Sequence, residues 1–392
     1  MNYILFDDSI WENLLPITFT RPVGEIKIGI LKIRQKWEYF LKEKCSFSTK
    51  NYLSKKFVLK KTNFNVLINS SILPNKNLVS EIQSLELNQI LIKENTIIAF
   101  CVSNFETENI LKNISNFEKK NFYDDFFQIK NIWEVFEKNG QEIENDFRLI
   151  TKNRKSEEIS STNRIINKEN IFLEKGAKLE FSTLNASEGV IYIGKNSQIM
   201  EGAMIRGSFA ISENSTVKMG AKIYGETSIG KGCKIGGEIS NVVFFDYSNK
   251  AHDGYLGNAI IGSWCNLGAD TNNSNLKNNY SKVKIWKYKE KKFINTNLQF
   301  CGLIMADHSK TGINTMLNTG TVIGVSSNIF GGGFPRVFIP SFSWGGANGF
   351  VNYRINKVLE VAEIVMKRRN KNEEEIQEEK EILKKIYSNV NN

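Results

Sequence analysis

The sequence has little histidine and little cysteine, and it has no long apolar run. Two of its 392 residues are His and five are Cys. No two cysteines form a C-x-x-C pair, so a structural zinc site is not expected. A disulfide framework is not expected in a chain of this length either. Apolar stretches such as 97–102 are far shorter than the roughly 18 residues of a membrane helix.

The chain carries a moderate excess of positive charge. Its 52 basic and 42 acidic residues give a net charge of +10, and ten of the basic residues are Arg. The Lys residues are scattered and form no dense stripe, so nucleic acid is not an expected partner, whereas an anionic small molecule is. Residues 1–8 lack the basic and apolar segments of a signal peptide. We therefore expect a cytoplasmic protein with no membrane partner.

The composition divides the chain into three regions, which agrees with two or three domains of roughly 100–200 residues each. Residues 1–150 mix strand and helix signals and predict an α/β domain. Residues 151–164 are polar throughout and predict a linker. In the first domain, the pattern predicts buried strands at 3–6, 65–68 and 96–102, and a helix at 28–41.

The strongest pattern is a period of six residues. Every sixth position is aliphatic, and the residue two places earlier is mostly small. A period of six fits neither a helix nor a plain hairpin, but it fits a triangular solenoid in which three short strands form one coil. Similarity to hexapeptide-repeat proteins makes this a left-handed parallel β-helix over residues 165–346. The aliphatic positions are Ile193, Ile199, Ile205, Ile211, Val217, Ile223, Ile229 and Ile235.

The six-residue pattern is interrupted at 241–252 and again at 270–297. Cys233 and Cys265 occupy small core positions of the pattern, so they are expected to be buried and not nucleophilic. The polar excursion at 270–297 is expected to carry a binding function or to reach a neighbouring subunit. The last part, 347–392, predicts one C-terminal helix that caps the open end of the solenoid and then extends into solvent.

His252 lies inside the first interruption, in the run NKAHDGYLG. A histidine of ordinary pKa near 6.5 can accept a proton at neutral pH. His252 stands beside Lys250 and Asp253, where the coil departs from its regular pattern. The alternative interpretation is a surface-loop histidine. His308 has no comparable cluster around it in the sequence, so a structural role is expected there.

Residues 250–271 resemble the acetyltransferase core of the bifunctional GlmU family. That resemblance implies that His252 is the general base that deprotonates a sugar amine. It also implies a homotrimer, with acyl-CoA in the groove between adjacent solenoids. By the same resemblance, the substrate-binding residues are Lys250, Tyr255, Asn266 and Asn275, and the acyl-CoA channel is lined by Thr319 and Gly320.

Residues 15–22, LPITFTRP, and the following Gly29-Ile30-Leu31 resemble the segment that follows the Gly-rich loop of sugar-phosphate nucleotidyltransferases. The Gly-rich loop that precedes this segment in those enzymes is absent here, since strand 3–6 is followed by Asp-Asp-Ser. The resemblance implies nucleotide binding by Arg21 and Lys27, and Mg²⁺ binding by Asp7 and Asp8.

The expected function is acetyl-CoA-dependent N-acetylation of an aminosugar phosphate of the glucosamine-1-phosphate type. It would be coupled to nucleotidyl transfer from a nucleoside triphosphate, giving a UDP-sugar such as UDP-N-acetylglucosamine. One alternative is an acyltransferase with a degenerate, non-catalytic nucleotidyltransferase domain, which the missing Gly-rich loop favours. Another is a non-enzymatic solenoid scaffold, against which His252, Tyr255 and Asn266 argue.

Overall fold

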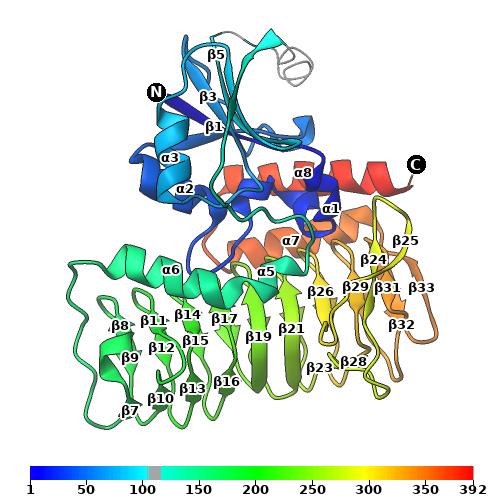
Figure 1. Ribbon diagram of the computed structural model, residues 1–392. Helices are drawn as coiled ribbons and strands as arrows, with labels where there is room; N and C mark the ends of the chain where they lie inside the picture. Colours follow the sequence, from blue (N-terminus) through cyan, green and yellow to red (C-terminus); the bar gives the residue numbers. More distant parts are fainter. Residues whose placement is uncertain (104, 106–115, 392) are drawn as a thin grey trace. The chain divides into compact units, whose positions relative to one another are not determined.

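The computed structural model describes residues 1–103, 105 and 116–391 (Figure 1). The chain forms two compact units, Met1–Ile26 with Leu31–Ile132, and Lys27–Ile30 with Trp133–Asn392. The boundary therefore falls after residue 132, not at residue 150. Helices α5 (Glu134–Glu137) and α6 (Asn139–Thr151) belong to the second unit, and Figure 1 shows them running along the solenoid.

The first unit is an α/β domain built on a mixed sheet of six strands in the order β2-β1-β3-β5-β4-β6. β1 pairs in parallel with β2 and β3, whereas β5 is antiparallel to both β3 and β4. The three predicted strands are present as β1, β3 and β5. The strands are β1 (Asn2–Phe6), β2 (Cys45–Ser48), β3 (Asn65–Asn69), β4 (Gln89–Lys93), β5 (Thr96–Val102) and β6 (Glu118–Asn121); the helices are α1 (Ile10–Asn13), α2 (Ile33–Leu41) and α3 (Lys76–Gln83).

The helix predicted at 28–41 begins later, at Ile33, because tertiary hydrogen bonds hold the preceding segment in another conformation. The Gly29 N–H donates to Asn139 Oδ1 at 2.8 Å, and the Ile30 N–H donates to Asp146 Oδ2 at 2.9 Å. Gly29 has φ of +79° and no room for a Cβ, which would lie 2.7 Å from the Glu142 carbonyl oxygen. Only glycine fits this position.

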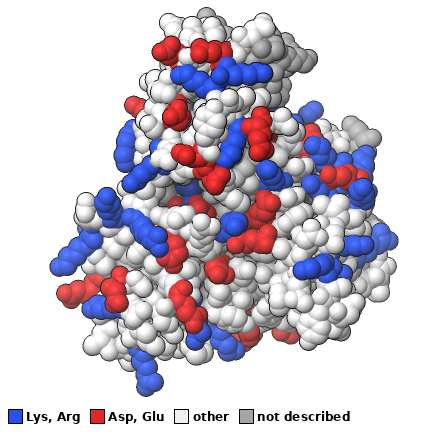
Figure 2. Space-filling model, viewed as in Figure 1, with Lys and Arg blue, Asp and Glu red and all other residues white. Residues whose placement is uncertain are grey.

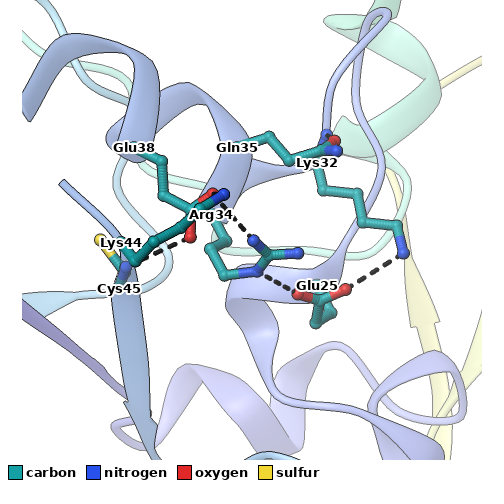
Figure 3. A network of polar contacts seen from close by, with 7 residues as sticks. All are labelled: Glu25, Lys32, Arg34, Gln35, Glu38, Lys44 and Cys45. Atoms are coloured by element: carbon teal, nitrogen blue, oxygen red, sulfur yellow. Dashed lines mark hydrogen bonds and ion pairs between the residues drawn. The ribbon is translucent and has the colours of Figure 1, made fainter. Parts of the chain in front are cut away.

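An ion-pair network stabilises the start of α2 (Figure 3). Glu25 accepts from Arg34 Nε at 2.6 Å and from Lys32 Nζ at 3.1 Å, and Arg34 Nη1 also lies 2.9 Å from Glu38. Burial raises the pKa of Glu25, but the charges of Lys32 and Arg34 outweigh it, so the pKa is lowered overall. The network therefore joins the short helix η2 (Val23–Glu25) to α2.

The second unit is a parallel β-solenoid (Figure 1). Each predicted aliphatic position of the six-residue pattern points into the core, and all eight side chains are at most 2% exposed. Two large sheets run along the solenoid. One contains β7 (Arg164–Ile166), β8 (Ile171–Leu173), β10 (Thr183–Asn185), β11 (Ile191–Ile193), β13 (Met204–Arg206), β14 (Phe209–Ile211), β16 (Lys222–Tyr224), β17 (Thr227–Ile229), β19 (Glu238–Phe244), β21 (Tyr255–Ile261), β26 (Leu303–Met305), β29 (Thr321–Ile323) and β31 (Phe338–Ile339).

The second large sheet contains ten strands. Two small pairs of strands complete the unit: β23 (Asn272–Asn273) with β28 (Met316–Leu317), which are parallel, and β24 (Lys284–Lys287) with β25 (Lys292–Asn295), which form an antiparallel hairpin. The ten strands are β9 (Lys178–Leu179), β12 (Gln198–Ile199), β15 (Thr216–Val217), β18 (Lys234–Ile235), β20 (Asn249–Lys250), β22 (Asn266–Leu267), β27 (Lys310–Thr311), β30 (Asn328–Ile329), β32 (Ser343–Gly346) and β33 (Gly349–Asn352).

The interruption at 241–252 is a shortened coil. Thr216 pairs with Lys234, 18 residues later, whereas Lys234 pairs with Asn249, only 15 residues later. The next two long strands, β19 and β21, pair along most of their length and replace separate short strands with a turn between them. The missing residues shift the phase of the pattern without interrupting the parallel ladder.

The cysteines of the solenoid are core residues, as predicted. Cys233 and Cys265 are at most 1% exposed, and each Sγ lies 3.1 Å from a backbone carbonyl oxygen. Burial raises the pKa of both thiols to about 12. Neither thiol is therefore a nucleophile at neutral pH.

The hairpin inside the excursion 270–297 packs on its own solenoid. Trp286 of β24 stacks on Phe338 with ring centroids 4.3 Å apart, and its edge meets Phe293 of β25 at 5.3 Å. The excursion also contains β23, which continues the parallel ladder by pairing with β28. Part of the excursion is therefore a coil with polar residues and not a free loop.

The C-terminal part differs from the prediction of one helix that extends into solvent. It forms two helices, α7 (Ile355–Lys367) and α8 (Glu373–Asn391), which pack against each other. Apolar residues of α8 are buried, Ile376 and Leu383 among them, because α8 is amphipathic and folds back. Met366 and Ile376 pack on Trp264 of the solenoid.

His308 joins the solenoid to α8. Its Nε2 lies 2.9 Å from Glu379 Oε1, and both side chains are 2% exposed. The Trp264 ring is stacked beside the His308 ring, with centroids 6.2 Å apart. The structural role expected for His308 therefore agrees with its position.

We predict that Ile229→Ala lowers the free energy of unfolding by about 2–5 kcal/mol, because it leaves a cavity in a fully buried position. Urea unfolding of the two proteins measures this loss. Met219→Ala is the matched control, since Met219 is 64% exposed, and it should change stability little. Equal stability of the Ile229 variant and the parent would contradict the inward position of this side chain.

We predict that Glu379→Ala destabilises the protein by about 1–3 kcal/mol, because it leaves the buried His308 ring without this partner. Hydrogen exchange should show that α8 is the part of the chain that loses protection. Glu360→Ala, which removes an exposed ion pair with Lys357, is the control. Unchanged protection of α8 in the Glu379 variant would show that the pair does not hold the helix.

Candidate functional site

His252 is exposed on the turn between β20 and β21. The turn is held from inside by Lys250, whose Nζ donates to the carbonyl oxygens of His252 at 3.0 Å and of Asp253 at 3.1 Å. A Cβ on Gly237 would lie 2.9 Å from both Lys250 Nζ and the His252 carbonyl oxygen, so the packing around the turn is tight. His252 therefore has a fixed backbone and a free path to solvent.

The position of Lys250 corrects its assignment as a substrate-binding residue. Its side chain is fully buried, and its ammonium group is directed at the two carbonyl groups of the turn. Burial lowers the pKa of Lys250 to about 8, and Asp253 and Asp270 oppose this effect. Lys250 positions the turn and does not face a substrate in this chain.

Tyr255, three residues after His252, is in contact with Asn275. Asn275 Nδ2 donates to Tyr255 Oη at 2.9 Å and to Asn258 Oδ1 at 2.7 Å. Burial raises the pKa of Tyr255, Asn275 opposes this effect, and the charge of Glu238 adds to it. The resulting cluster is neutral at physiological pH and offers donors and acceptors for hydroxyl groups.

A groove of about 610 Å³ lies on the face that carries β13, β16 and β19. Glu238 lines this groove and is the direct register neighbour of Tyr255 on the next strand, so the groove ends one strand away from the tyrosine. Its polar lining also includes Tyr224, whose Oη donates to Glu238 at 2.6 Å. Arg206 and Lys222 are its basic residues, Glu188 and Glu238 are its acidic ones, and Arg206 Nη1 lies 3.4 Å from Glu188 Oε1.

Lys222 and Glu238 were not predicted as binding residues from the sequence. A signal was present in the pattern. Lys222 and Glu238 are register neighbours in the outward position before the inward Ile223 and Ile239 on successive coils. Outward positions of neighbouring coils form a row on the surface, since adjacent strands are about 4.8 Å apart.

Asn266 does not join Tyr255 and Asn275. It lies on β22 in the other large sheet, exposed, with Asn249 and Lys310 as its register neighbours. Within this chain, the structure therefore divides the predicted sugar-binding residues between two faces of the solenoid.

The turn predicted to line an acyl-CoA channel is largely occupied by contacts within the chain. The Gly320 N–H donates to the Cys301 carbonyl oxygen at 3.0 Å, so a contact of Gly320 with acyl-CoA would use its other backbone groups. Thr319 Oγ1 donates to Ser274 Oγ at 2.8 Å. Gly320 has φ of +73°, and a Cβ there would meet the Lys284 carbonyl oxygen at 2.6 Å, so its role is to turn the chain.

In the first unit, Asp7 is buried in a cluster of donors. Its Oδ1 accepts from the Val23 N–H at 3.0 Å and from Ser70 Oγ at 2.6 Å, and its Oδ2 accepts from Thr49 Oγ1 at 2.5 Å. Burial raises the pKa of Asp7 to about 6, and these hydrogen bonds oppose the rise only in part. Both carboxylate oxygens are already used within the protein.

Both carboxylate oxygens of Asp8 also accept hydrogen bonds within the protein. Its Oδ1 accepts from the Ile10 N–H at 2.8 Å, and its Oδ2 accepts from Asn69 Nδ2 at 2.9 Å. Within residues 1–103, 105 and 116–391, no three His, Cys, Asp or Glu side chains gather in a way that could hold a metal ion. Asp7 and Asp8 therefore do not fit the predicted Mg²⁺ site, and we assign no catalytic step to a metal there.

The two predicted phosphate-binding cations belong to different units. Arg21 is in the first unit and is 7% exposed, and its carbonyl oxygen accepts from Trp11 Nε1 at 3.3 Å. Lys27 is in the second unit, where its Nζ donates to the Ile30 carbonyl oxygen at 2.6 Å and to Ser212 Oγ at 3.1 Å. Lys27 is thus buried in structural contacts, which corrects its assignment as a nucleotide-binding residue.

The chain is similar to a known family over its first part and to several curated proteins. Residues 3–155 match the family model described as sugar nucleotidyl transferase. The resemblance to bifunctional GlmU proteins is confirmed. The chain is 31% identical over 143 residues to "Bifunctional protein GlmU" of Trichodesmium erythraeum, covering 36% of this chain and 26% of that protein. It is 32% identical over 138 residues to the GlmU protein of Trichormus variabilis, covering 33% and 26%.

The chain thus spans about a quarter of the length of these curated relatives. Among solved structures, a UDP-N-acetylglucosamine acyltransferase of Arabidopsis is similar with a TM-score of 0.24 and 15% identity, over 56% of this chain and 80% of that one. A likeness at this score carries no argument about the chemistry of this chain. The family match and the relatives support a transferase.

The surface charge is mixed. On the face shown in Figure 2, basic and acidic side chains alternate and form no continuous positive stripe. Among the residues that the structure describes, none of the helices is both long enough and apolar enough to cross a bilayer.

We predict that the stability of the protein falls as the pH rises from about 4 to about 6, through the buried Asp7. In the unfolded chain Asp7 ionises near its ordinary pKa of 3.8, whereas in the folded protein it stays protonated up to about 6. The unfolded state therefore releases its proton first, which costs on the order of 3 kcal/mol above pH 6. Urea unfolding of the parent and of Asp7→Asn at pH 4 and pH 7 measures this loss.

The Asp7→Asn variant does not titrate at this position, so its stability relative to the parent should increase from pH 4 to pH 7. Asp253→Asn, at an exposed carboxylate in the second unit, is the control and should show no such change. A constant difference between parent and Asp7→Asn across this range would contradict the raised pKa.

Proposed function

We propose that the protein transfers an acetyl group from acetyl-CoA to the amine of an aminosugar phosphate of the glucosamine-1-phosphate type. The observation that carries this proposal is the arrangement at the start of β21. There His252 is exposed on a turn fixed by Lys250, and Tyr255, three residues later, accepts a hydrogen bond from Asn275. The groove that ends at Glu238 adds two basic side chains, Arg206 and Lys222, that could bind a phosphate group.

The chemistry of amide formation explains why these groups suffice. An amine attacks a thioester only in its unprotonated form, so a base must lie within hydrogen-bond reach of it. In the proposed reaction the amine nitrogen bonds to the thioester carbonyl carbon while His252 takes up the amine proton. The bond from carbon to sulfur then breaks, and the leaving thiolate of coenzyme A takes the proton back from His252. No covalent intermediate on the protein is needed.

Lys222 and Arg206 are the groups of the groove that could bind a phosphorylated sugar. Lys222 is in the row that leads through Glu238 to Tyr255, whereas Arg206 is in the adjacent row and would exchange Glu188 for the phosphate. Guanidinium and ammonium groups bind phosphate by charge-assisted hydrogen bonds. Tyr255 and Asn275 would then contact the sugar hydroxyl groups near the base. Thr319, next to the turn at Gly320, remains a candidate acyl-CoA contact through its side chain.

We further propose that the active form is a homotrimer. The resemblance of residues 250–271 to the GlmU acetyltransferase core, which implies a homotrimer, supports this. Solenoid faces can pack about a threefold axis. We predict a mass of three chains by light scattering at micromolar concentration. A monomer under these conditions would contradict an active site shared between chains.

We also propose that the first unit transfers a nucleotidyl group from a nucleoside triphosphate, with UTP as the donor and a UDP-sugar such as UDP-N-acetylglucosamine as the product. The match of residues 3–155 to sugar nucleotidyl transferases supports this step, and Arg21 is the candidate phosphate-binding residue. The second candidate is an acyltransferase whose first unit is not catalytic. It is favoured by Asp7 and Asp8, whose carboxylate oxygens are already occupied by protein donors.

The test is an assay of the purified protein with acetyl-CoA, glucosamine 1-phosphate and UTP that follows free thiol and pyrophosphate separately. Release of both products is expected. Thiol release without pyrophosphate would select the second candidate. Release of neither product would contradict both and would favour a solenoid scaffold or another substrate.

We predict that His252→Ala lowers kcat for acyl transfer by about 10²–10⁴-fold, the usual contribution of positioned proton transfer. Acetyl-CoA binding and the fold should persist, because the side chain is exposed. Any release of pyrophosphate should be unchanged. Steady-state kinetics of thiol release measures the loss.

Glu201→Ala, at an exposed turn of another coil, is the matched control and should keep full activity. His308→Ala is unsuitable as a control, since it removes a buried partner of Glu379. Full acyl-transfer activity in the His252 variant would refute its role as the base.

A further inference from the structure

A second cavity, of about 390 Å³, lies over the other large sheet of the solenoid. It is bounded by strands β18, β20, β22 and β27 and by the end of α7 with the residues that follow it. Four of its lining residues are basic, and among the described residues that line it none is acidic. The basic residues are Lys234, Lys310, Arg368 and Arg369.

The floor of the cavity follows from the register of the ladder. Lys234, Asn249, Asn266 and Lys310 are consecutive register neighbours on four adjacent strands. Neighbouring strands lie about 4.8 Å apart, so these side chains form one outward row with a lysine at each end and two amides between them. Both lysines and both amides can donate hydrogen bonds to an anion, and the only acceptors in the row are the two amide oxygens.

Several of these groups are not used within the chain. The side chains of Lys234, Asn266 and Arg368 form no hydrogen bond or ion pair with any other residue in the described part of the chain. Arg369 Nη2 donates to Asn249 Oδ1 at 2.9 Å, and Lys310 Nζ donates to the His308 carbonyl oxygen at 3.1 Å. Four cations around one cavity repel each other, and a bound anion would offset that repulsion.

The wall behind the cations is rigid. Tyr247 and Trp264 are stacked with ring centroids 4.3 Å apart, and Trp264 packs on Met366 of α7 and Ile376 of α8. Burial lowers the pKa of Lys310, with a small opposing effect of Cys265. The cavity thus lies between the end of α7 and the solenoid, and its basic residues are gathered around one enclosed space.

We propose that this cavity binds the phosphate group of a small organic phosphate, a nucleotide or a sugar phosphate, between Lys234, Lys310 and Arg368. Its volume lies within the 300–1,000 Å³ that is typical of small-molecule sites and is larger than a lone phosphate ion requires. Arginine binds phosphate through two parallel N–H groups, and lysine acts as a point charge. The site is on the opposite sheet from Tyr255, and it does not rest on the proposed acyl transfer.

The test is titration calorimetry of the full chain with AMP, with glucose 1-phosphate and with inorganic phosphate, at constant ionic strength. At least one of the two organic phosphates should bind more tightly than inorganic phosphate. Lys234→Ala and Arg368→Ala should each weaken that binding by about 10- to 100-fold, the usual loss for a hydrogen bond to a charged group. The organic probe that binds more tightly identifies the nucleotide or the sugar as the source of the phosphate.

Lys178→Ala is the matched control. Lys178 is an exposed lysine at the same outward register as Lys234 but three strands away, and it does not line the cavity. Its loss should leave binding unchanged. Lys234→Gln keeps most of the side-chain length and should lose binding as Lys234→Ala does, even if the alanine variant folds poorly.

Three results would overturn the proposal. One is no heat of binding for either organic phosphate at millimolar concentration. The second is binding that persists unchanged in both Lys234→Ala and Arg368→Ala, which would place the ligand elsewhere on the protein. The third is inorganic phosphate that binds as tightly as both organic probes, which would show an adventitious ion only.

Discussion

The inward aliphatic side chain at every sixth residue is the constraint on which the solenoid depends. Each Ile or Val closes one side of a coil, and the parallel ladder then fixes every outward side chain relative to the coils on either side. Because the core register cannot slip without exposing these side chains, the outward rows are fixed as well. Both candidate ligand sites of the second unit consist of such rows, which is why short strands of two or three residues can build precise surfaces.

The same constraint explains which features could be predicted from the sequence. Ile193 to Ile235 predicted the solenoid, and the burial of Cys233 followed from its place in the pattern. Tertiary contacts escaped prediction, since no local signal encodes them. The segment before α2 is held by Asn139 and Asp146, more than a hundred residues away, and α8 folds back to bury apolar residues and to meet His308.

In the candidate site, too, some residues could be identified from the sequence, whereas their contacts could not. His252, Tyr255 and Asn275 were identified by resemblance, and the structure places Tyr255 and Asn275 in direct contact. The sequence could not show that Lys250 and Lys27 turn inward to backbone carbonyl groups, because a lysine in a motif is usually expected at the surface. The oxygens of Asp7 and Asp8 were likewise already occupied by donors that only the folded chain brings near.

The central claim is that an exposed base on a fixed turn acts on the amine of a sugar phosphate. A crystal structure of the protein with glucosamine 1-phosphate and coenzyme A tests it most directly. We predict an amine nitrogen about 3 Å from a ring nitrogen of His252, with sugar hydroxyl groups at Tyr255 and Asn275 and the phosphate toward Arg206 and Lys222. An amine bound beyond reach of His252, with the sugar held by other residues, would contradict the account.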